Sequence, residues 1–184
     1  MKTNTKTYIA LLRGINVSGH KKIKMADLRF LLEKEGFTNV KTYIQSGNVI
    51  FSGKEEESTK LEHQIRALIK NNYKFEVPVL VKTAEQIKAI LAKNPYKDTE
   101  DLTNNKIYFV LLKETPNVEN ITVLSSIPFD NEKLVITPNC VYLRCALGAG
   151  KAKCTNNFIE NKLKVSATTR NYKTMQKVLE LALV

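Results

Sequence analysis

The stretch Val40-Lys41-Thr42-Tyr43-Ile44-Gln45-Ser46-Gly47-Asn48-Val49-Ile50-Phe51-Ser52 decides the fold that the sequence predicts. Its two ends are rich in β-branched and aromatic residues, and the Gly47-Asn48 pair between them is typical of a tight turn. We therefore expect a β-hairpin, with one strand over residues 40–46 and the other over residues 49–52.

The residues on both sides of this hairpin extend the pattern. A β-rich apolar run occupies residues 7–12, and residues 77–81 form another run, in which Pro78 indicates a strand at a sheet edge. Apolar residues recur at helical spacing before and after the hairpin: Met25, Leu28, Leu31 and Leu32, then Leu61, Ile65, Leu68 and Ile69. The resulting order over residues 7–82, β-α-β-β-α-β, is the ferredoxin-like arrangement, and we expect its first strand to be central.

The second half of the chain has a related order. The capping-box pattern Thr83-Ala84-Glu85-Gln86 begins a connecting helix. Strands are expected over residues 106–113, 133–137 and 140–146. With three short helices, the last starting near Tyr172, this half reads β-α-β-β-α-α, which resembles the first half with its final strand lost or replaced. We therefore predict an α+β fold with two subdomains, residues 1–82 and residues 83–184, packed against each other.

Positive charge is concentrated at the two ends of the chain. Residues 1–82 carry 15 Lys and Arg against 8 Asp and Glu, and residues 139–184 carry 8 against 2, whereas residues 83–138 carry 6 against 8. A clustered basic surface attracts anions such as phosphate, nucleotides and nucleic acid. Lysine-rich helices that simply face solvent would give the same composition, so the charge alone leaves both interpretations open.

Composition also limits the class of protein. With 43% hydrophobic and 26% charged residues, the chain of 184 residues is typical of a folded globular protein. Residues 1–10 lack the apolar core of a signal peptide, and the apolar runs are far shorter than the roughly 20 residues of a membrane helix. Three cysteines crowded into residues 140–154 argue against a secreted disulfide framework. We expect a cytoplasmic protein that does not interact with membranes.

The motifs that would carry catalysis or hold a cofactor are incomplete. Gly148-Ala149-Gly150-Lys151 lacks the earlier glycine and the following Ser or Thr of a phosphate loop, although its lysine could still contact an anion. The three cysteines have no fourth zinc ligand nearby, and His20 and His63 have the pattern of surface residues. Tyr8 and Phe51 lie on expected strands but match no RNA-recognition signature. The sequence therefore predicts no metal and no cofactor, and it leaves any catalytic residues unknown.

Polar residues gather where three apolar stretches end. The predicted ligand-binding residues are Arg13, Asn16, Gln45, Ser46 and Asn48 in the first half and Thr169, Arg170 and Asn171 in the second. The first group would converge if the first two strands are neighbours, and the second would add donors at the N-terminus of the last helix. Guanidinium, amide and hydroxyl groups in such places are suited to bind an oxyanion or a phosphate. Turn formation, helix capping and local ion pairs would explain the same residues without a ligand.

Four segments resemble a known family. They are YIALLRGINV (residues 8–17), KMADL (24–28), TYIQSGNVIF (42–51) and ATTRNY (167–172). In these segments, and in their order along the chain, the protein resembles the bacterial family called domain of unknown function 1697. The resemblance implies a small cytoplasmic α+β protein with ferredoxin-like character and no established activity. Two positions depart from the family pattern, because Tyr172 stands where Trp is frequent and Ser18-Gly19 where a Gly-Gly pair is frequent.

These observations predict a protein that binds a phosphate-bearing ligand, either nucleic acid or a nucleotide-like metabolite. Two alternatives stay open: an enzyme, such as a transferase or hydrolase, that acts on a small anionic substrate in the same pocket, and a module that binds a protein partner. The lack of a His or Cys base with a visible partner favours binding over hydrolysis.

Overall fold

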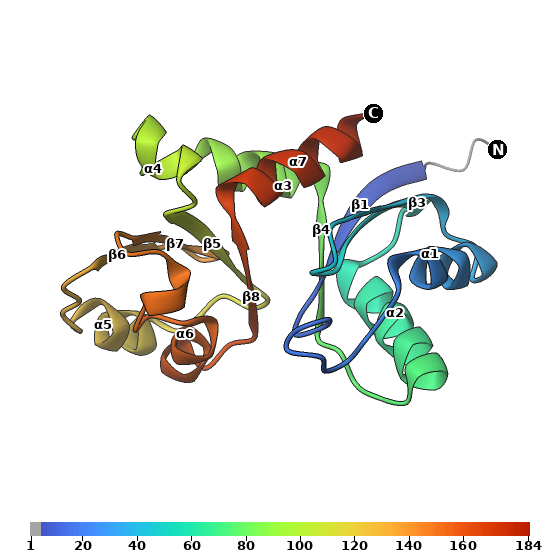
Figure 1. Cartoon of the computed structure of the whole chain (residues 1–184), viewed down its shortest axis with the longest axis horizontal. Helices are drawn as coiled ribbons and strands as arrows, with labels where there is room; N and C mark the ends of the chain where they lie inside the picture. Colours follow the sequence, from blue (N-terminus) through green and yellow to red (C-terminus); the bar gives the residue numbers. More distant parts are fainter. Residues whose placement is uncertain (1–4) are drawn as a thin grey trace. The chain divides into compact units, whose positions relative to one another are not determined.

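The computed structural model describes residues 5–184 and divides the chain into two compact units. Unit 1 contains the residues up to Lys88 together with residues 177–184, and unit 2 contains residues 89–176. The division falls inside two helices, α3 (Ala84–Ala92) and α7 (Tyr172–Leu183), so both helices contribute residues to both units (Figure 1). The subdomain boundary at residue 82 stays a prediction.

Unit 1 has a four-stranded antiparallel sheet with the strand order β2-β3-β1-β4. Its elements follow the chain as β1 (Thr5–Leu12), α1 (Met25–Lys34), β2 (Thr38–Tyr43), β3 (Asn48–Lys54), α2 (Ser58–Tyr73) and β4 (Val79–Thr83). Figure 1 shows α1 and α2 on the same side of this sheet. The predicted β-α-β-β-α-β order and the central position of the first strand are confirmed.

Alternating strand residues supply the core of unit 1. Tyr8, Ala10 and Leu12 of β1 are buried in one cluster with Leu28 of α1 and Ile65 of α2. Side chains two residues apart lie on one face of a strand, so these positions of β1 face the two helices. Each large apolar side chain that is fully buried in this way stabilises the fold by about 1.5–3 kcal/mol.

The hairpin of unit 1 closes through a wider turn than the sequence predicts. The strand β2 ends at Tyr43 and β3 begins at Asn48, so residues 44–47 form the turn and the predicted Gly47-Asn48 turn is wrong. The reason lies in the side chain of Asn48, whose Nδ2 donates to Tyr43 O (3.0 Å) and to Ser46 Oγ (3.1 Å). These hydrogen bonds connect the two sides of the longer turn, which places Asn48 inside the ladder.

Unit 2 repeats this architecture. Its antiparallel sheet has the strand order β6-β7-β5-β8. Its elements are α4 (Thr99–Thr103), β5 (Ile107–Leu112), α5 (Val118–Ser125), β6 (Glu132–Ile136), β7 (Cys140–Cys145), a 3-10 turn (Ala149–Lys151), α6 (Asn156–Leu163) and β8 (Ala167–Asn171). The predicted α+β fold with two related halves is therefore confirmed.

The final strand of the second half is present, so the prediction that it is lost or replaced is wrong. Residues 167–171 form β8 along β5, with Thr169 opposite Val110. The β-branched threonines favour a strand, and β5 offers the ladder partner. The predicted start of the last helix near Tyr172 is confirmed. The helix α7 follows directly, and Asn171 Oδ1 accepts the N–H of Thr174 at 2.9 Å.

Backbone hydrogen bonds show which residues of the two halves are equivalent. At the end of the central strand of each unit, two successive N–H groups donate to the two neighbouring segments. The bonds are Leu12 N to Gly47 O (2.8 Å) and Arg13 N to Pro78 O (3.0 Å) in unit 1, and Leu112 N to Asn139 O (3.0 Å) and Lys113 N to Ser166 O (2.9 Å) in unit 2. Together with the common strand order, this pattern supports a duplication in which residue 12 corresponds to residue 112.

Each half also covers one edge of its sheet with a glutamate from the helix that precedes its last strand. The Glu62 Oε1 atom accepts the N–H of Val81 in β4 (3.0 Å), and Glu160 Oε1 accepts the N–H of Ala167 in β8 (2.7 Å). Such bonds occupy N–H groups that an edge strand would otherwise offer to another chain.

The helices of the described chain are short. The longest of them, α2, spans Ser58–Tyr73, and within residues 5–184 no helix combines the length and the apolar character needed to cross a membrane.

Candidate anion-binding site

One side chain holds the connection between β1 and α1, residues 13–24, in a closed loop. The Asn16 Nδ2 atom donates to Ile23 O (2.9 Å) and Gln45 O (2.8 Å), and Asn16 Oδ1 accepts the N–H of Ile23 (2.9 Å). Asn16 itself has a φ of +54°, in the left-handed region that asparagine tolerates better than most residues. Its amide therefore fixes this loop to the β2–β3 turn, and a direct contact between Asn16 and a ligand stays a prediction.

The other predicted residues of unit 1 lie on or near the same turn. Asn48 is buried, and its amide binds Ser46 as described above. Arg13 follows β1 and is anchored through its backbone N–H. Gln45 is exposed, and together with Asn16 it lines a cavity at the start of α1. The structure therefore brings Asn16 and Gln45 together at this cavity, next to the turn that Ser46 and Asn48 stabilise.

This cavity, which we call the α1 cavity, has a volume of about 720 Å³. The polar residues that line it are Asn16, Lys22, Lys24, Asp27, Arg29, Gln45 and Tyr73. Within the described chain, the side chain of Lys24 at the N-cap position of α1 makes no capping hydrogen bond. The first N–H groups of a helix have no partner inside the helix, and its N-terminus carries a partial positive charge. The start of α1 therefore offers donors to an anion.

The α1 cavity is lined by three cationic side chains and one anionic side chain. Lys22 and Lys24 are exposed, whereas Arg29 is half-buried and its Nη1 donates to Thr42 Oγ1 at 2.6 Å. Asp27 supplies the negative charge from the first turn of α1. The lining is therefore positively charged at neutral pH, with one carboxylate that can accept a hydrogen bond.

Tyr73, at the end of α2, also lines the α1 cavity, and its hydroxyl lies beneath the surface. This hydroxyl is buried and has no hydrogen-bond partner among the described residues. Burial and, to a smaller extent, the carboxylate of Asp27 raise the pKa of Tyr73. The hydroxyl therefore stays protonated at neutral pH and can donate a hydrogen bond.

The predicted residues of the second half form hydrogen bonds within unit 2. Thr169 Oγ1 donates to Asn156 Oδ1 (2.8 Å), and Arg170 Nη1 donates to Thr168 Oγ1 (3.0 Å) and Thr169 O (2.9 Å). Burial lowers the pKa of the Arg170 guanidinium to about 10. Asn171 caps α7. These bonds give the three residues a role in fixing β8, and a site that combines them with the first half stays a prediction.

Several residues of the α1 cavity are missing from the sequence prediction: Lys22, Lys24, Asp27, Arg29 and Tyr73. A signal exists for the two lysines, because they directly precede the helical pattern, where acidic residues are usually preferred. Arg29 and Tyr73 carry no local signal. They reach the cavity only because α1 and α2 pack on the same sheet.

The cysteines and histidines of the chain do not form a catalytic group of recognisable type. Cys140, Cys145 and Cys154 are buried free thiols, and burial raises the pKa of Cys145 to about 11 and that of Cys154 to about 12. Such thiols stay protonated and are poor nucleophiles. His20 and His63 are exposed. Within residues 5–184, no group of three or more His, Cys, Asp and Glu residues is arranged to hold a metal ion.

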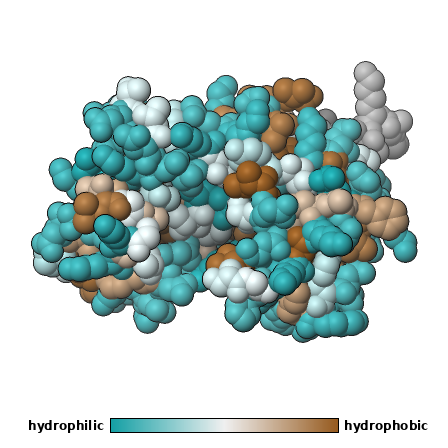
Figure 2. Space-filling view, viewed as in Figure 1, coloured by the Kyte–Doolittle hydropathy of each residue, from teal (hydrophilic) through white to brown (hydrophobic). Residues whose placement is uncertain are grey.

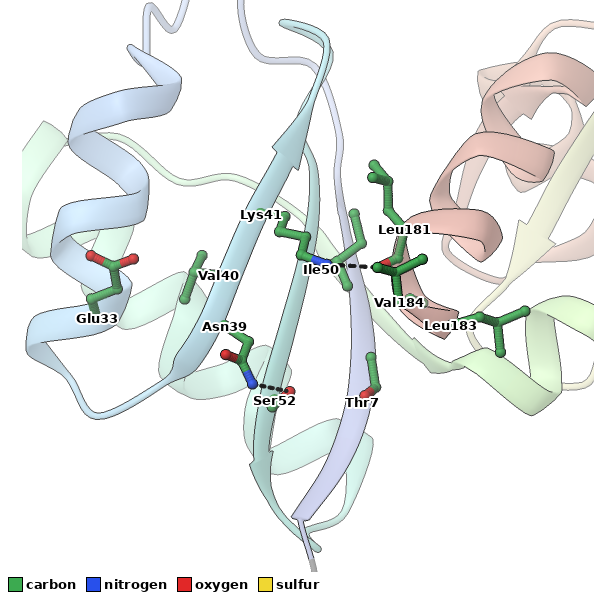
Figure 3. Close-up of a pocket in the computed structure, with 11 residues that line it drawn as sticks. Thr7, Glu33, Asn39, Val40, Lys41, Ile50, Ser52, Leu181, Leu183 and Val184 are labelled. Atoms are coloured by element: carbon green, nitrogen blue, oxygen red, sulfur yellow. Dashed lines mark hydrogen bonds between the residues drawn. The ribbon is translucent and has the colours of Figure 1, made fainter.

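A second cavity of unit 1, of about 690 Å³, lies between its strands and the last residues of the chain (Figure 3). Lys41 Nζ donates to Leu181 O (3.4 Å), and Asn39 Nδ2 donates to Ser52 Oγ (3.3 Å). A lysine at the C-terminus of a helix stabilises the negative end of its dipole. Because these polar groups bind one another, the α1 cavity is the better candidate for a ligand site.

Known proteins share the sequence pattern and the fold of the chain. The family model described as "Protein of unknown function (DUF1697)" matches residues 5–142. The solved structure of the conserved bacterial protein SP0830 from Streptococcus pneumoniae is similar to the chain, with a TM-score of 0.73 and 24% sequence identity over 97% of this chain and 99% of that chain. At this identity the likeness shows the fold alone. No curated protein matches the chain.

Proposed function

The chain belongs to this family of proteins of unknown function, and we propose that it binds a phosphate-bearing ligand in the α1 cavity. The observation that carries the proposal is the lining itself, in which Lys22, Lys24 and Arg29 surround the uncapped start of α1. Phosphate oxygens accept hydrogen bonds from helix N-termini, ammonium groups and guanidinium groups. The arrangement therefore suits an anion with several oxygen atoms.

The remaining lining residues have separate roles in this proposal. Asn16 keeps the loop closed, so that Lys22 and Lys24 stay beside α1. Asp27 repels a phosphate that approaches it directly, and it accepts a hydrogen bond from a hydroxyl or amino group elsewhere on the ligand.

The lining also contains groups that catalysis could use. It includes neither His nor Cys, but Asp27 is a carboxylate of the kind that serves as a general base. An enzyme that acts on a small anionic substrate in the same cavity is therefore the second candidate function. We also propose a cytoplasmic location, which the three free and buried cysteines support, because reducing compartments keep thiols free.

Calorimetric titration with pyrophosphate at low ionic strength tests the proposal. We expect the double variant Lys22→Gln/Lys24→Gln to bind pyrophosphate about tenfold more weakly, which corresponds to about 1.4 kcal/mol for two partly exposed charge contacts. The matched control is Lys151→Gln/Lys153→Gln, which removes two exposed lysines from the second half. An equal loss of affinity in both double variants, or no binding by the unaltered protein, would contradict the proposal.

A further inference from the structure

A second group of basic residues adjoins the α1 cavity on unit 1. Arg66 and Lys70 of α2 line a smaller hollow of about 220 Å³ together with Glu76. Lys70 Nζ forms an ion pair with Glu76 Oε1 (2.7 Å), and Lys21 Nζ of the β1–α1 loop donates to Glu76 O (2.7 Å). Glu76 thus joins the loop that lines the first cavity to the helix that lines the second.

The two hollows are linked by Glu76 and by α2, where Lys70 of the smaller hollow stands one turn before Tyr73 of the α1 cavity, and we call their basic residues together the basic track. Its cations are Lys21, Lys22, Lys24, Arg29, Arg66 and Lys70. The two acids beside them are Glu76, whose ion pair also occupies Lys70, and Asp27, which lines the α1 cavity. One phosphate group would fill only part of a track of this extent.

Three exposed apolar residues are sequence neighbours of residues that line the α1 cavity. Val17, Ile44 and Phe30 are 58%, 50% and 66% exposed. Each directly adjoins a residue that lines the α1 cavity, because Val17 follows Asn16, Ile44 precedes Gln45, and Phe30 follows Arg29. In Figure 2 apolar groups form separate patches on a largely hydrophilic face. Exposed apolar residues thus neighbour residues of this basic lining along the chain.

The local backbone bears on two of these residues, Ile44 and Phe30. Ile44 has a φ of +50°, a conformation that β-branched residues rarely adopt. Phe30 lies one turn after Ala26, a lining residue on the same face of α1, and side chains in helices lean toward the preceding turn. Phe30 therefore shares a face of α1 with the lining residue Ala26.

We infer that the basic track binds a single-stranded nucleic acid, an inference that rests on the proposed function. Successive phosphates follow the cations, the α1 cavity takes one of them, and Phe30 stacks on a neighbouring base. Unpaired bases expose flat apolar faces that stack on aromatic side chains, whereas a duplex hides these faces inside its stack. The exposed apolar groups therefore distinguish a single strand from a duplex as the partner.

Fluorescence anisotropy with a labelled oligothymidine of about 12 nucleotides, a length within the range of known single-strand sites, tests this inference. If about four phosphates are neutralised, affinity should fall about 50-fold between about 50 and 200 mM salt. We expect the oligothymidine to bind at least tenfold more tightly than pyrophosphate or a duplex of the same length. An affinity equal to that of the duplex would overturn the inference.

Two variants separate base stacking from phosphate binding. Phe30→Ala should weaken oligothymidine binding at least about fivefold, because stacking of one base is lost, and should leave pyrophosphate binding unchanged. The control is Val123→Ala, which shortens an exposed apolar side chain on α5, the equivalent helix of the second half, and should change neither affinity. If pyrophosphate binds in the α1 cavity but Phe30→Ala has no effect on oligothymidine, the inference fails and the proposed function stands. If pyrophosphate does not bind, both the inference and the proposed function fail.

Discussion

The two halves share a strand order but differ in the connection between the first strand and the first helix. In the first half, residues 13–24 form a long loop with several left-handed residues, and α1 begins without a capping bond from the Lys24 side chain within the described chain. In the second half, residues 113–117 make a short connection, and Asn117 Oδ1 accepts the N–H of Asn120 at the start of α5. The first helix thus keeps donors for an anion, and the second uses an internal cap.

This difference separates the proposed site from the elements that the two similar halves share. Both halves have the same ladder at the end of the central strand, so the sheet alone does not distinguish them. The long loop with Asn16, Lys22 and Lys24 occurs only in the first half, because the second half connects the equivalent elements through residues 113–117 alone. Connections on a rigid scaffold can change without loss of the core, and binding sites are often built from them. The second half therefore serves as an internal control for the first.

The largest expected effect comes from the turn that supports the loop. Gly47 has a φ of +80°, and a Cβ atom there would lie 2.6 Å from Leu12 Cβ and 2.8 Å from Ile15 Cδ1. We expect Gly47→Ala to lower the free energy of unfolding by about 3 kcal/mol, from a left-handed alanine and an overpacked contact together. Urea denaturation measures this change.

Gly148 in the second half supplies the matched control for this variant. It has nearly the same φ, +79°, but no described atom lies within 4 Å of its Cβ position. Gly148→Ala should therefore cost only the backbone contribution, about 1 kcal/mol. An equal decrease in the free energy of unfolding for the two variants would show that the contact of residue 47 with Leu12 and Ile15 is unimportant.

A smaller effect is expected from the side chain that closes the loop. Asn16→Ala removes three hydrogen bonds and should lower the free energy of unfolding by about 2 kcal/mol. It should also weaken pyrophosphate binding, because Lys22 and Lys24 lose their fixed position. Asn139→Ala in the second half removes one exposed side-chain bond, to Thr137 Oγ1 at 3.3 Å, and should be nearly neutral. A stable Asn16→Ala variant with full affinity would contradict this role of the loop.

The smallest expected effect is an acid sensitivity that belongs to the second half. The Arg144 guanidinium and, to a smaller extent, the Lys106 ammonium group lower the pKa of the Asp101 carboxyl, and its burial opposes them. Because the folded pKa lies below the unfolded value of about 3.9, this stabilisation is complete above that pH and is lost as the pH falls through the folded pKa. Asp101→Asn should destabilise unit 2 by about 1 kcal/mol at neutral pH and remove this dependence.

Hydrogen exchange of the β5 and β7 amides as a function of pH measures this prediction. The control is Glu56→Gln in the first half, which breaks an exposed pair with Lys60 (2.6 Å) of little energetic value. If both variants show the same pH dependence, the Asp101 pair adds no stability specific to the second half.

The sequence predicts the features of this fold that depend on residues close together in the chain. Strand alternation and helical spacing locate the elements of the first half. The core residues of these elements recur at the same two spacings, which confirms both patterns. The Thr83–Gln86 capping box is confirmed by two hydrogen bonds, Thr83 N to Gln86 Oε1 (2.9 Å) and Gln86 N to Thr83 Oγ1 (3.3 Å). Asn16 and Gln45 are likewise predicted for the site, and both line the α1 cavity.

The strand β8 shows the limit of such local information. Thr83 and Asn171 hold equivalent positions, opposite Tyr8 and Tyr108 at the point where a strand passes directly into a helix. The sequence predicts a strand before Thr83 because that segment is apolar. Before Asn171 the polar residues indicate a cap, and only their pairing with β5, about 60 residues away, makes them a strand.

By itself, the sequence determined the element order of the first half, the α+β class and the polar residues around the β2–β3 turn. These features follow from local propensity and periodicity, which a chain carries whatever its partners are. Only the tertiary structure decided that Arg29 and Tyr73 share a cavity with Lys22 and Lys24, and that Asn16 and Asn48 use their amides to hold the backbone. Such choices depend on which segments pack together, and packing joins residues whose separation along the chain gives no local signal.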